Sequence, residues 1–209
     1  MPSRAPSILP FPVTFRFNLT ALLIVYALLL ALGLGLGSAY LALKGDPPFG
    51  GVRLGPWQGW PRLGSQEADP YMRAITAYRS SIPLAVGEGL ALTASVDSDG
   101  RPLDSACTYR VGSATPPARL WTLSVYDRDG RLAVSELGRS GFTSSEILWN
   151  ADDTFTIVLS RGLSAGNWLQ LPQSGRFSLA LRLYDTPGVV GSYLDPTVFP
   201  SIQRVECRS

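Results

Sequence analysis

One run of 25 residues without a charged side chain constrains this chain more than any other feature. Residues 19–43 read LTALLIVYALLLALGLGLGSAYLAL. At about 1.5 Å of rise per residue, a helix of this length is roughly 37 Å long, which crosses a hydrocarbon core of about 30 Å with some tilt. The alternative is a cleaved signal peptide, whose apolar run is usually about 7–15 residues and precedes a site of small residues. Because Leu43 and Lys44 make a poor site of that kind, we expect an uncleaved anchor.

The basic residues that flank this run predict its orientation. Arg4 and Arg16 precede it without an acidic neighbour, whereas Lys44 follows it with Asp46 close by. Positive residues concentrate on the cytoplasmic side of a span. We therefore expect a bacterial inner-membrane protein with a cytoplasmic tail (1–18), a transmembrane helix (19–43) and everything beyond it in the periplasm.

Small residues recur along the predicted span. They are Ala27, Ala31, Gly35 and Ala39 at intervals of four, with the G-x-x-x-G pair Gly33 and Gly37 beside them. Small side chains let a second helix approach closely. The line therefore predicts packing against another membrane helix, although glycine is also simply frequent in membrane helices.

The composition of the chain excludes several classes of function. The formal net charge is only +2 and no basic block is present, so nucleic-acid binding has no support. The chain has no histidine, which excludes a Ser-His-Asp or Cys-His nucleophile within it and all histidine-ligated metal sites. We expect no catalytic residue, no metal site and no cofactor.

The two cysteines are candidates for a disulfide. Cys107 lies in a predicted strand and Cys207 lies near the end of the sequence. Because the predicted topology places both outside the cytoplasm, a bridge is favoured over two buried thiols.

The remaining chain divides into a linker and one domain. The Gly- and Pro-rich interval 44–65 carries Trp57 and Trp60, which would lie at the membrane interface or pack on the domain as an arm. In the domain, residues 66–209, Asp69-Pro70 predicts the start of a helix that runs to about residue 80. A second short helix is expected over residues 143–149.

From residue 89 the apolar pattern changes to a period of two. Alternation predicts strands over residues 92–96, 107–111, 120–126, 155–159 and 177–183. Asp99-Gly100 and Asp129-Gly130 are typical of hairpin turns. The fold class is therefore mainly β: an N-terminal transmembrane helix followed by a jelly-roll-like antiparallel β-sandwich with one or two short helices.

Several motifs, in this order, resemble the bacterial family called domain of unknown function 1214. They are Ala68-Asp69-Pro70-Tyr71-x-Arg73-Ala74, Asp97-Ser98-Asp99-Gly100-Arg101-Pro102-Leu103, Pro116-Pro117-Ala118-Arg119-x-Trp121-x-Leu123, Tyr126-Asp127-x-Asp129-Gly130, Asn167-Trp168-Leu169 and Leu181-Arg182-Leu183-Tyr184. The resemblance covers about residues 59–207. It implies a jelly-roll β-sandwich in the cell envelope, often beside a domain of unknown function 1254, for which this chain leaves no room. It implies no reaction and no catalytic residue.

Three side-chain constellations have alternative interpretations. The Asp-x-Asp-Gly motifs at Asp97 and Asp127 resemble the start of a calcium loop, but Thr108 and Gly138 stand where an EF-hand loop needs glutamate, so hairpin turns are favoured. A group of charged residues could supply acid–base chemistry if two of its carboxylates converged, but side chains of solvated loops are the favoured interpretation. The group consists of Arg119, Arg182, Asp127, Glu146, Asp152 and Asp153. Trp121 and Trp168, with Trp57 and Trp60, form a ligand or partner face or fill the core.

These observations predict a non-catalytic accessory subunit of a larger membrane complex, respiratory or photosynthetic for example. Its partners would be other membrane subunits, contacted through the span and linker, and the lipid bilayer. Alternatives are a periplasmic glycan- or small-ligand-binding module and a hydrolase that uses paired carboxylates.

Overall fold

The computed structural model describes residues 18–79, 81–85, 87–114, 116, 118–133, 135–186 and 195–207, so most of the expected N-terminal tail lies outside the described residues. The chain divides after Lys44 into two compact units. In the first unit, helix α1 (Leu19–Lys44) has no buried residue. It is the one helix in the described part that is long and apolar enough to cross a membrane, which fits an anchor or a signal sequence.

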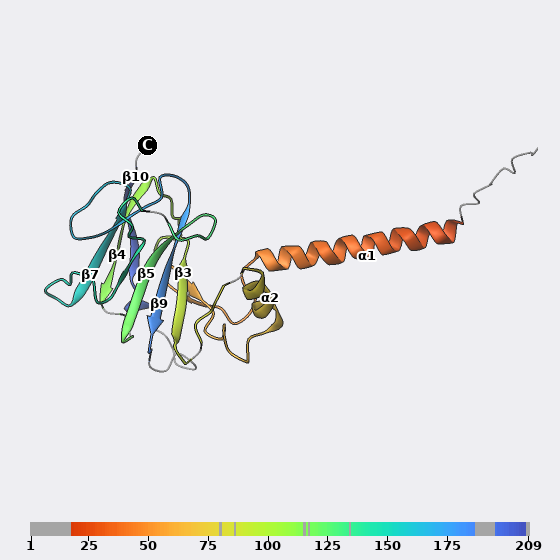
Figure 1. Ribbon diagram of the computed structural model, residues 1–209, viewed down its shortest axis with the longest axis horizontal. Helices are drawn as coiled ribbons and strands as arrows, with labels where there is room; N and C mark the ends of the chain where they lie inside the picture. The colour runs from red at the N-terminus through yellow and green to blue at the C-terminus, as the bar shows by residue number, and fades with distance from the viewer. Residues whose placement is uncertain are drawn as a thin grey trace, which may run out of the picture. The chain divides into compact units, whose positions relative to one another are not determined.

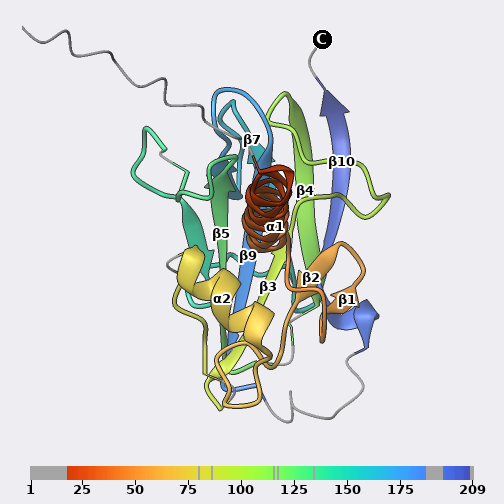
Figure 2. The same cartoon turned by 90° about the vertical axis from the view of Figure 1, so that its right-hand side faces the viewer.

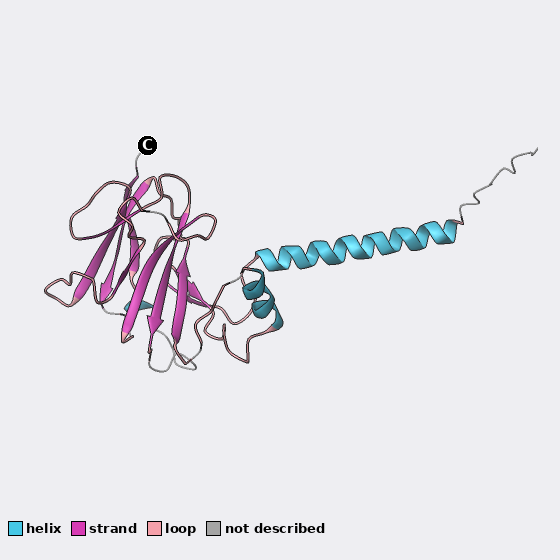
Figure 3. Cartoon of the chain, viewed as in Figure 1, coloured by secondary structure: helices cyan, strands magenta, loops and turns pink. Residues whose placement is uncertain are grey.

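The second unit is built mainly from β-strands (Figures 1 and 3). Its elements, in chain order, are β1 (Val52–Leu54), β2 (Trp57–Gly59), α2 (Pro70–Tyr78), β3 (Gly89–Ala94), β4 (Cys107–Ala114), β5 (Leu120–Asp127), β6 (Gly141–Thr143), β7 (Thr154–Ser160), β8 (Asn167–Gln170), β9 (Phe177–Tyr184), the 3₁₀ turn η1 (Pro196–Val198) and β10 (Ser201–Cys207). One sheet has the order β1-β2-β3-β9-β5-β6 and the other β10-β4-β7-β8. The pairs are antiparallel except β7 with β8, which run parallel.

The two sheets pack against each other across one hydrophobic core. Figure 2 shows β5, β9 and β3 side by side in one sheet and β4 beside β10 in the other. Alternate residues of β5, such as Trp121 and Leu123, are buried while their neighbours are partly exposed, because successive side chains of a strand point to opposite faces. The indole of Trp121 stacks on the ring of Phe155 from the other sheet at 4.7 Å between centroids. The expected β-sandwich is therefore confirmed.

Helix α2 begins as the sequence predicts. The Asp69 carboxylate accepts hydrogen bonds from the backbone N–H groups of Tyr71 and Met72, at 2.8 and 3.1 Å, and Pro70 occupies the first helical position, where no N–H is needed. Met72 and Ile75 form the buried side of this short helix.

The interval expected as a linker contributes to the sheet. Residues 52–59 form the β1–β2 hairpin, and β2 pairs with β3. Trp57 is fully buried and its indole N–H donates to the carbonyl of Pro200 at 2.7 Å. The hairpin is thus part of the folded unit, because its tryptophan completes the sandwich core.

The helix expected over residues 143–149 is wrong. β6 ends at Thr143, a turn follows, and Trp149 makes an isolated bridge with Phe155. The Glu146 carboxylate does accept from the backbone N–H of Thr143, at 3.2 Å, as it would in a helix cap. Because Trp149 already pairs with Phe155, the segment after the turn is extended and does not continue as a helix.

The two Asp-x-Asp-Gly motifs are hairpin turns, as expected. In the first, Asp97 accepts from the backbone N–H groups of Asp99 and Arg101; in the second, Asp127 accepts in the same way from Asp129 and Arg131. Among the described residues no group of three or more potential ligand side chains could hold a metal ion.

The first of these turns also holds the last strand. The side chain of Asp97 is fully buried, with Arg101 Nε at 3.0 Å and Arg204 Nε, from β10, at 3.2 Å. Burial opposes the charged form of Asp97, but the hydrogen bonds from Arg101 and the charges of both arginines outweigh it, so the pKa of this carboxyl lies below its usual value. Ser98 adds a hydroxyl that accepts from the N–H of Ile202.

A disulfide fastens the end of the same strand. Cys107 and Cys207 are directly opposite in the β4–β10 ladder and are bonded to each other, so the predicted bridge is confirmed. Between the bridge and Arg204 the register shifts by one residue at Val205. A bulge of this kind disturbs an open sheet edge and hinders pairing with other strands.

Candidate ligand-binding cleft

A cleft of about 390 Å³ opens where both sheets end. β6 is the last strand of one sheet and β8 is the last strand of the other. Residues of these strands and of the loops around them line the cleft, which we call the leucine cleft: Ser135, Leu137, Arg139, Phe142, Glu146, Leu148, Leu163, Ser164, Gly166, Asn167, Trp168 and Gln170. Its volume lies within the range of about 300–1,000 Å³ that is usual for small-molecule sites.

Three leucines stand at the leucine cleft with most of their surface in contact with solvent. The exposed fraction is 68% for Leu137, 65% for Leu148 and 83% for Leu163. Scattered exposed leucines are ordinary, whereas large contiguous apolar surfaces are typical of interaction sites.

Strand β8 presents two side chains to the cleft in a fixed orientation. Trp168 and Gln170 are two residues apart and so share one face of the strand. The indole N–H of Trp168 donates to the hydroxyl of Ser160 at 2.9 Å. Oε1 of Gln170 accepts from the hydroxyl of Ser135 at 3.1 Å and from the N–H of Glu136 at 3.0 Å. These bonds lock both side chains and leave the Nε2 donors of Gln170 without a partner in the described part of the chain.

An ion pair forms another part of the lining. Nη1 of Arg139 lies 3.8 Å from Oε2 of Glu146, and its guanidinium lies over the ring of Phe142 at 4.6 Å. Hydrogen bonds from the N–H and hydroxyl of Thr143 lower the pKa of Glu146, with a further contribution from the charge of Arg139. Both side chains remain about half exposed, so they can bind a ligand as well as each other.

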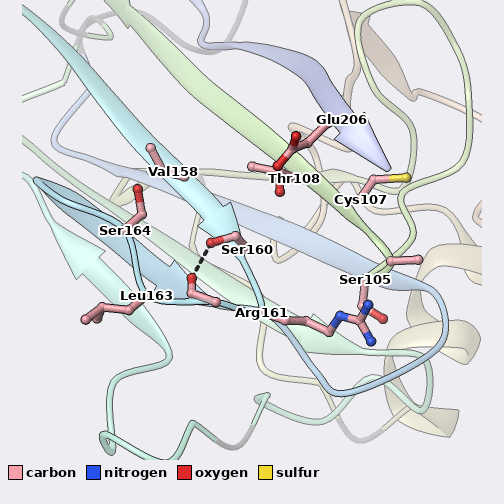
Figure 4. Close-up of a pocket in the computed structure, with 11 residues that line it drawn as sticks. Ser105, Cys107, Thr108, Val158, Ser160, Arg161, Leu163, Ser164 and Glu206 are labelled. Carbon is pink, nitrogen blue, oxygen red and sulfur yellow. Dashed lines mark hydrogen bonds between the residues drawn. The ribbon is translucent and has the colours of Figure 1, made fainter. Parts of the chain in front are cut away.

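A smaller hollow of about 170 Å³ lies on the other side of the loop 161–166 and shares Leu163 and Ser164 with the leucine cleft. Figure 4 shows its lining, with Arg161, Ser105 and Glu206 around it. The hydroxyl of Ser160 donates to the carbonyl of Gly162 at 2.6 Å, drawn as the dashed line. Because Ser160 also accepts from Trp168, this hydroxyl ties the loop to the indole.

The structure separates the four tryptophans of the predicted face. Trp57 and Trp121 are buried in the core, so they present no ligand surface. Trp60 is partly buried, and its N–H donates to the carbonyl of Pro47 at 3.0 Å, within the folded unit. Trp168 alone of the four lines the leucine cleft.

The charged residues considered for acid–base chemistry lie apart. Asp127 belongs to a hairpin turn, and Asp152 and Asp153 belong to the turn before β7. The hydroxyl and N–H of Thr154 bond to Asp152 and lower the pKa of its carboxyl. Arg119 pairs with Asp185 at 2.8 Å, while Arg182 donates to the hydroxyl of Tyr126 at 3.0 Å. Only Glu146 lines the leucine cleft.

Most of the leucine cleft escapes sequence reasoning. Arg139, Gln170 and the three leucines carry no motif, and four of them lie in loops or turns. The one usable signal is the spacing of Trp168 and Gln170, which places both on one face of any strand through Asn167-Trp168-Leu169.

One solved structure shares this fold, and a second shows a weaker similarity. The VPA0106 protein from Vibrio parahaemolyticus has a solved structure that aligns over 67% of this chain and 36% of its own, with a TM-score of 0.54 and 23% identity. A solved structure of an uncharacterized protein from Burkholderia cenocepacia aligns over 61% of this chain and 32% of its own, with a TM-score of 0.44 and 17% identity. The chain thus spans about a third of the length of each. None of the curated proteins compared with it matches significantly.

A family model matches the central region of the chain. It matches residues 88–188, which include β3 to β9 and therefore most of both sheets and the leucine cleft. The motifs from Asp97 to Tyr184 that carry the resemblance in the sequence fall in this region. Residues 88–188 of this chain match the model of the family described as Protein of unknown function (DUF1214).

Proposed function

We propose that the chain is an accessory subunit of a larger membrane complex, held by α1 as a single-pass anchor and carrying its β-sandwich in the periplasm. The observation that carries this proposal is the small-residue line of α1. A Cβ built on Gly33, Gly35 or Gly37 meets no atom within 4 Å, so nothing in the described part of the chain requires glycine there.

Glycine inside a helix is unfavourable unless something uses the space. Relative to alanine it costs about 0.8–1.0 kcal/mol per residue in water. In a membrane, small residues allow close contact between helix backbones. Gly33 and Gly35 are two residues apart and therefore lie on opposite sides of α1. A second membrane helix seated against Gly35 and its alanines, or one seated against Gly33 and Gly37, would use the space that this chain leaves open.

Two further observations support the proposed topology. The Cys107–Cys207 bridge suits an oxidising compartment such as the periplasm. The charge bias of the flanks, with Arg16 before α1 and with Lys44 and the acidic Asp46 at and after its end, also favours a cytoplasmic N-terminus. Thiol labelling of an added cysteine next to Arg16, compared with one near Gly45, measures this orientation in intact cells.

The test of the subunit role is co-purification after gentle extraction from the native membrane. The double variant Gly33→Leu, Gly35→Leu should lose its partner, because leucine side chains hold the helices apart. Leu34→Ile, which keeps the volume of the side chain in the same stretch, serves as the matched control and should retain the partner. Recovery of the double variant with an unchanged partner would contradict the packing role.

The leucine cleft favours a second candidate function. A cleft of this volume, lined by Trp168, three leucines and a few oriented polar groups, has the composition of a small-ligand site. We propose that the sandwich also binds a small molecule there. Binding that is lost when the cleft is blocked by Ser164→Trp, a partly exposed lining position, would support this function.

A further inference from the structure

We propose that the ligand of the leucine cleft is a saccharide unit, bound with one face of its ring on Trp168 and its hydroxyl groups on Gln170, Arg139 and Glu146. This inference rests on the second candidate function and adds to it the chemical class of the ligand and the residues that recognise it.

The indole ring of Trp168 is the aromatic platform of the leucine cleft. The indole of Trp168 is partly exposed and its N–H is already bonded to Ser160, so the group that remains for a ligand is its ring face. A π face is electron-rich and favours polarised C–H bonds that point toward it. A pyranose offers such a C–H face together with polar edges.

Three polar side chains line the leucine cleft around that platform and have groups available for a ligand. Gln170 offers Nε2–H donors, because its Oε1 is held by Ser135 and Glu136. Arg139 offers further N–H donors, and Glu146, whose contacts in the described part of the chain all go to Oε2, offers Oε1 as an acceptor. Hydroxyl groups both donate and accept, so neighbouring hydroxyls of one sugar ring can satisfy all three residues.

The same groups argue against an acyl chain, the other ligand that exposed leucines would suit. Burying the leucine side chains under an acyl chain is favourable. However, an alkyl chain in the cleft would cover the Nε2 donors of Gln170 and the half-exposed Arg139–Glu146 pair without bonding to them, and each polar group left unpaired weakens binding, a charged group most of all. A sugar ring stacked on Trp168 directs its hydroxyl groups at these polar side chains and avoids this cost.

The experiment uses the full chain in lipid nanodiscs, because glycoside detergents would compete for the site. Methyl glycosides of glucose and mannose, and N-acetylglucosamine, are probed by saturation-transfer NMR, with mannitol as an open-chain polyol that lacks a ring face and decanoate as an acyl probe. We expect saturation of C–H protons on one face of at least one glycoside ring, no signal for mannitol, and no displacement by decanoate.

Two variants locate the site. Trp168→Leu should abolish the signal, whereas Trp149→Leu, which removes an exposed tryptophan outside the cleft, should leave it unchanged. Gln170→Glu keeps the oxygen that Ser135 and Glu136 bind but replaces the Nε2 donor by an acceptor, and should raise Kd about tenfold or more. The Gln170 variant keeps the inference testable if Trp168→Leu fails to fold.

The outcomes separate the two proposals. Decanoate binding that is lost in Trp168→Leu, with no glycoside signal, would overturn the saccharide class and leave ligand binding in place. Equal signals for mannitol and the glycosides would also overturn it. Absence of binding by every probe at tens of millimolar would overturn the ligand function as well.

Discussion

Neutralising Asp97 should loosen the C-terminal strand, whereas the same change in the matching turn should not. Asp97→Asn keeps an oxygen that can accept from the backbone N–H groups of Asp99 and Arg101, so the turn survives. It removes the charge that faces Arg101 and Arg204.

The solvent exposure of the two arginines determines how much free energy of unfolding is lost. Removing one partner of a buried ion pair costs about 3–5 kcal/mol, because the other charge stays buried without compensation. Here the side chain of Arg101 is 48% exposed and rehydrates, while that of Arg204 is only 20% exposed. We therefore expect Asp97→Asn to lower the free energy of unfolding by about 2–4 kcal/mol.

Asp127→Asn is the matched control. It lies in a turn with the same Asp-x-Asp-Gly-Arg pattern and the same two backbone hydrogen bonds. Its turn is exposed and no ion pair to Asp127 is present among the described residues, so the change should cost less than about 0.5 kcal/mol.

Tryptophan fluorescence during denaturant unfolding in nanodiscs measures these free energies. All five tryptophans lie beyond residue 44, so the signal reports only the second unit. Because the pKa of Asp97 is lowered in the folded protein, its contribution is complete above the unfolded pKa of about 3.9 and disappears as pH falls through the folded pKa. Wild type and Asp97→Asn should therefore converge at low pH. Equal losses in both variants at pH 7, or no convergence, would refute the reasoning.

Three further perturbations test the fold. Reducing the Cys107–Cys207 bridge, whose cysteines are 100 residues apart, should lower stability by about 4–5 kcal/mol in the chain-entropy model, measured by denaturant unfolding with and without reductant; an unchanged midpoint would contradict it. Trp57→Phe should cost about 1–3 kcal/mol, because the buried carbonyl of Pro200 loses its donor, and a milder loss in thermal unfolding would show that water replaces the indole. Gly112→Ala should shift or weaken the β4–β7 pair, since its Cβ would lie 2.6 Å from the carbonyl oxygen of Phe155; hydrogen exchange of β7 measures this, and unchanged protection would count against it.

The sequence predicts the long strands because their alternation is local. Leu92, Trp121 and Leu181 each lie in a strand whose apolar residues recur at every second position. All three are buried, as that alternation requires. The order of the strands is not local: β9 lies between β3 and β5, although about 80 residues separate it from β3. That order depends on which faces bury each other.

The short strands could not be predicted from the sequence for a related reason. β1, β6 and β8 have only three or four residues and are fixed by their neighbours in the sheet rather than by their own pattern. The parallel pairing of β8 with β7 could not be predicted either. Only residues 161–166 connect the two strands, whereas parallel neighbours are usually joined by a crossover of a dozen or more residues. The leucine cleft lies between β6 and β8, so it could not be predicted beyond Trp168 and Glu146.

Native mass spectrometry of the chain extracted from its own membrane tests the central claim most directly. The account predicts a defined assembly that is heavier than this chain and that loses this subunit when Gly33 and Gly35 are replaced by leucine. Repeated recovery of a bare 22.5 kDa chain, under conditions that keep other membrane complexes of the same preparation intact, would contradict it.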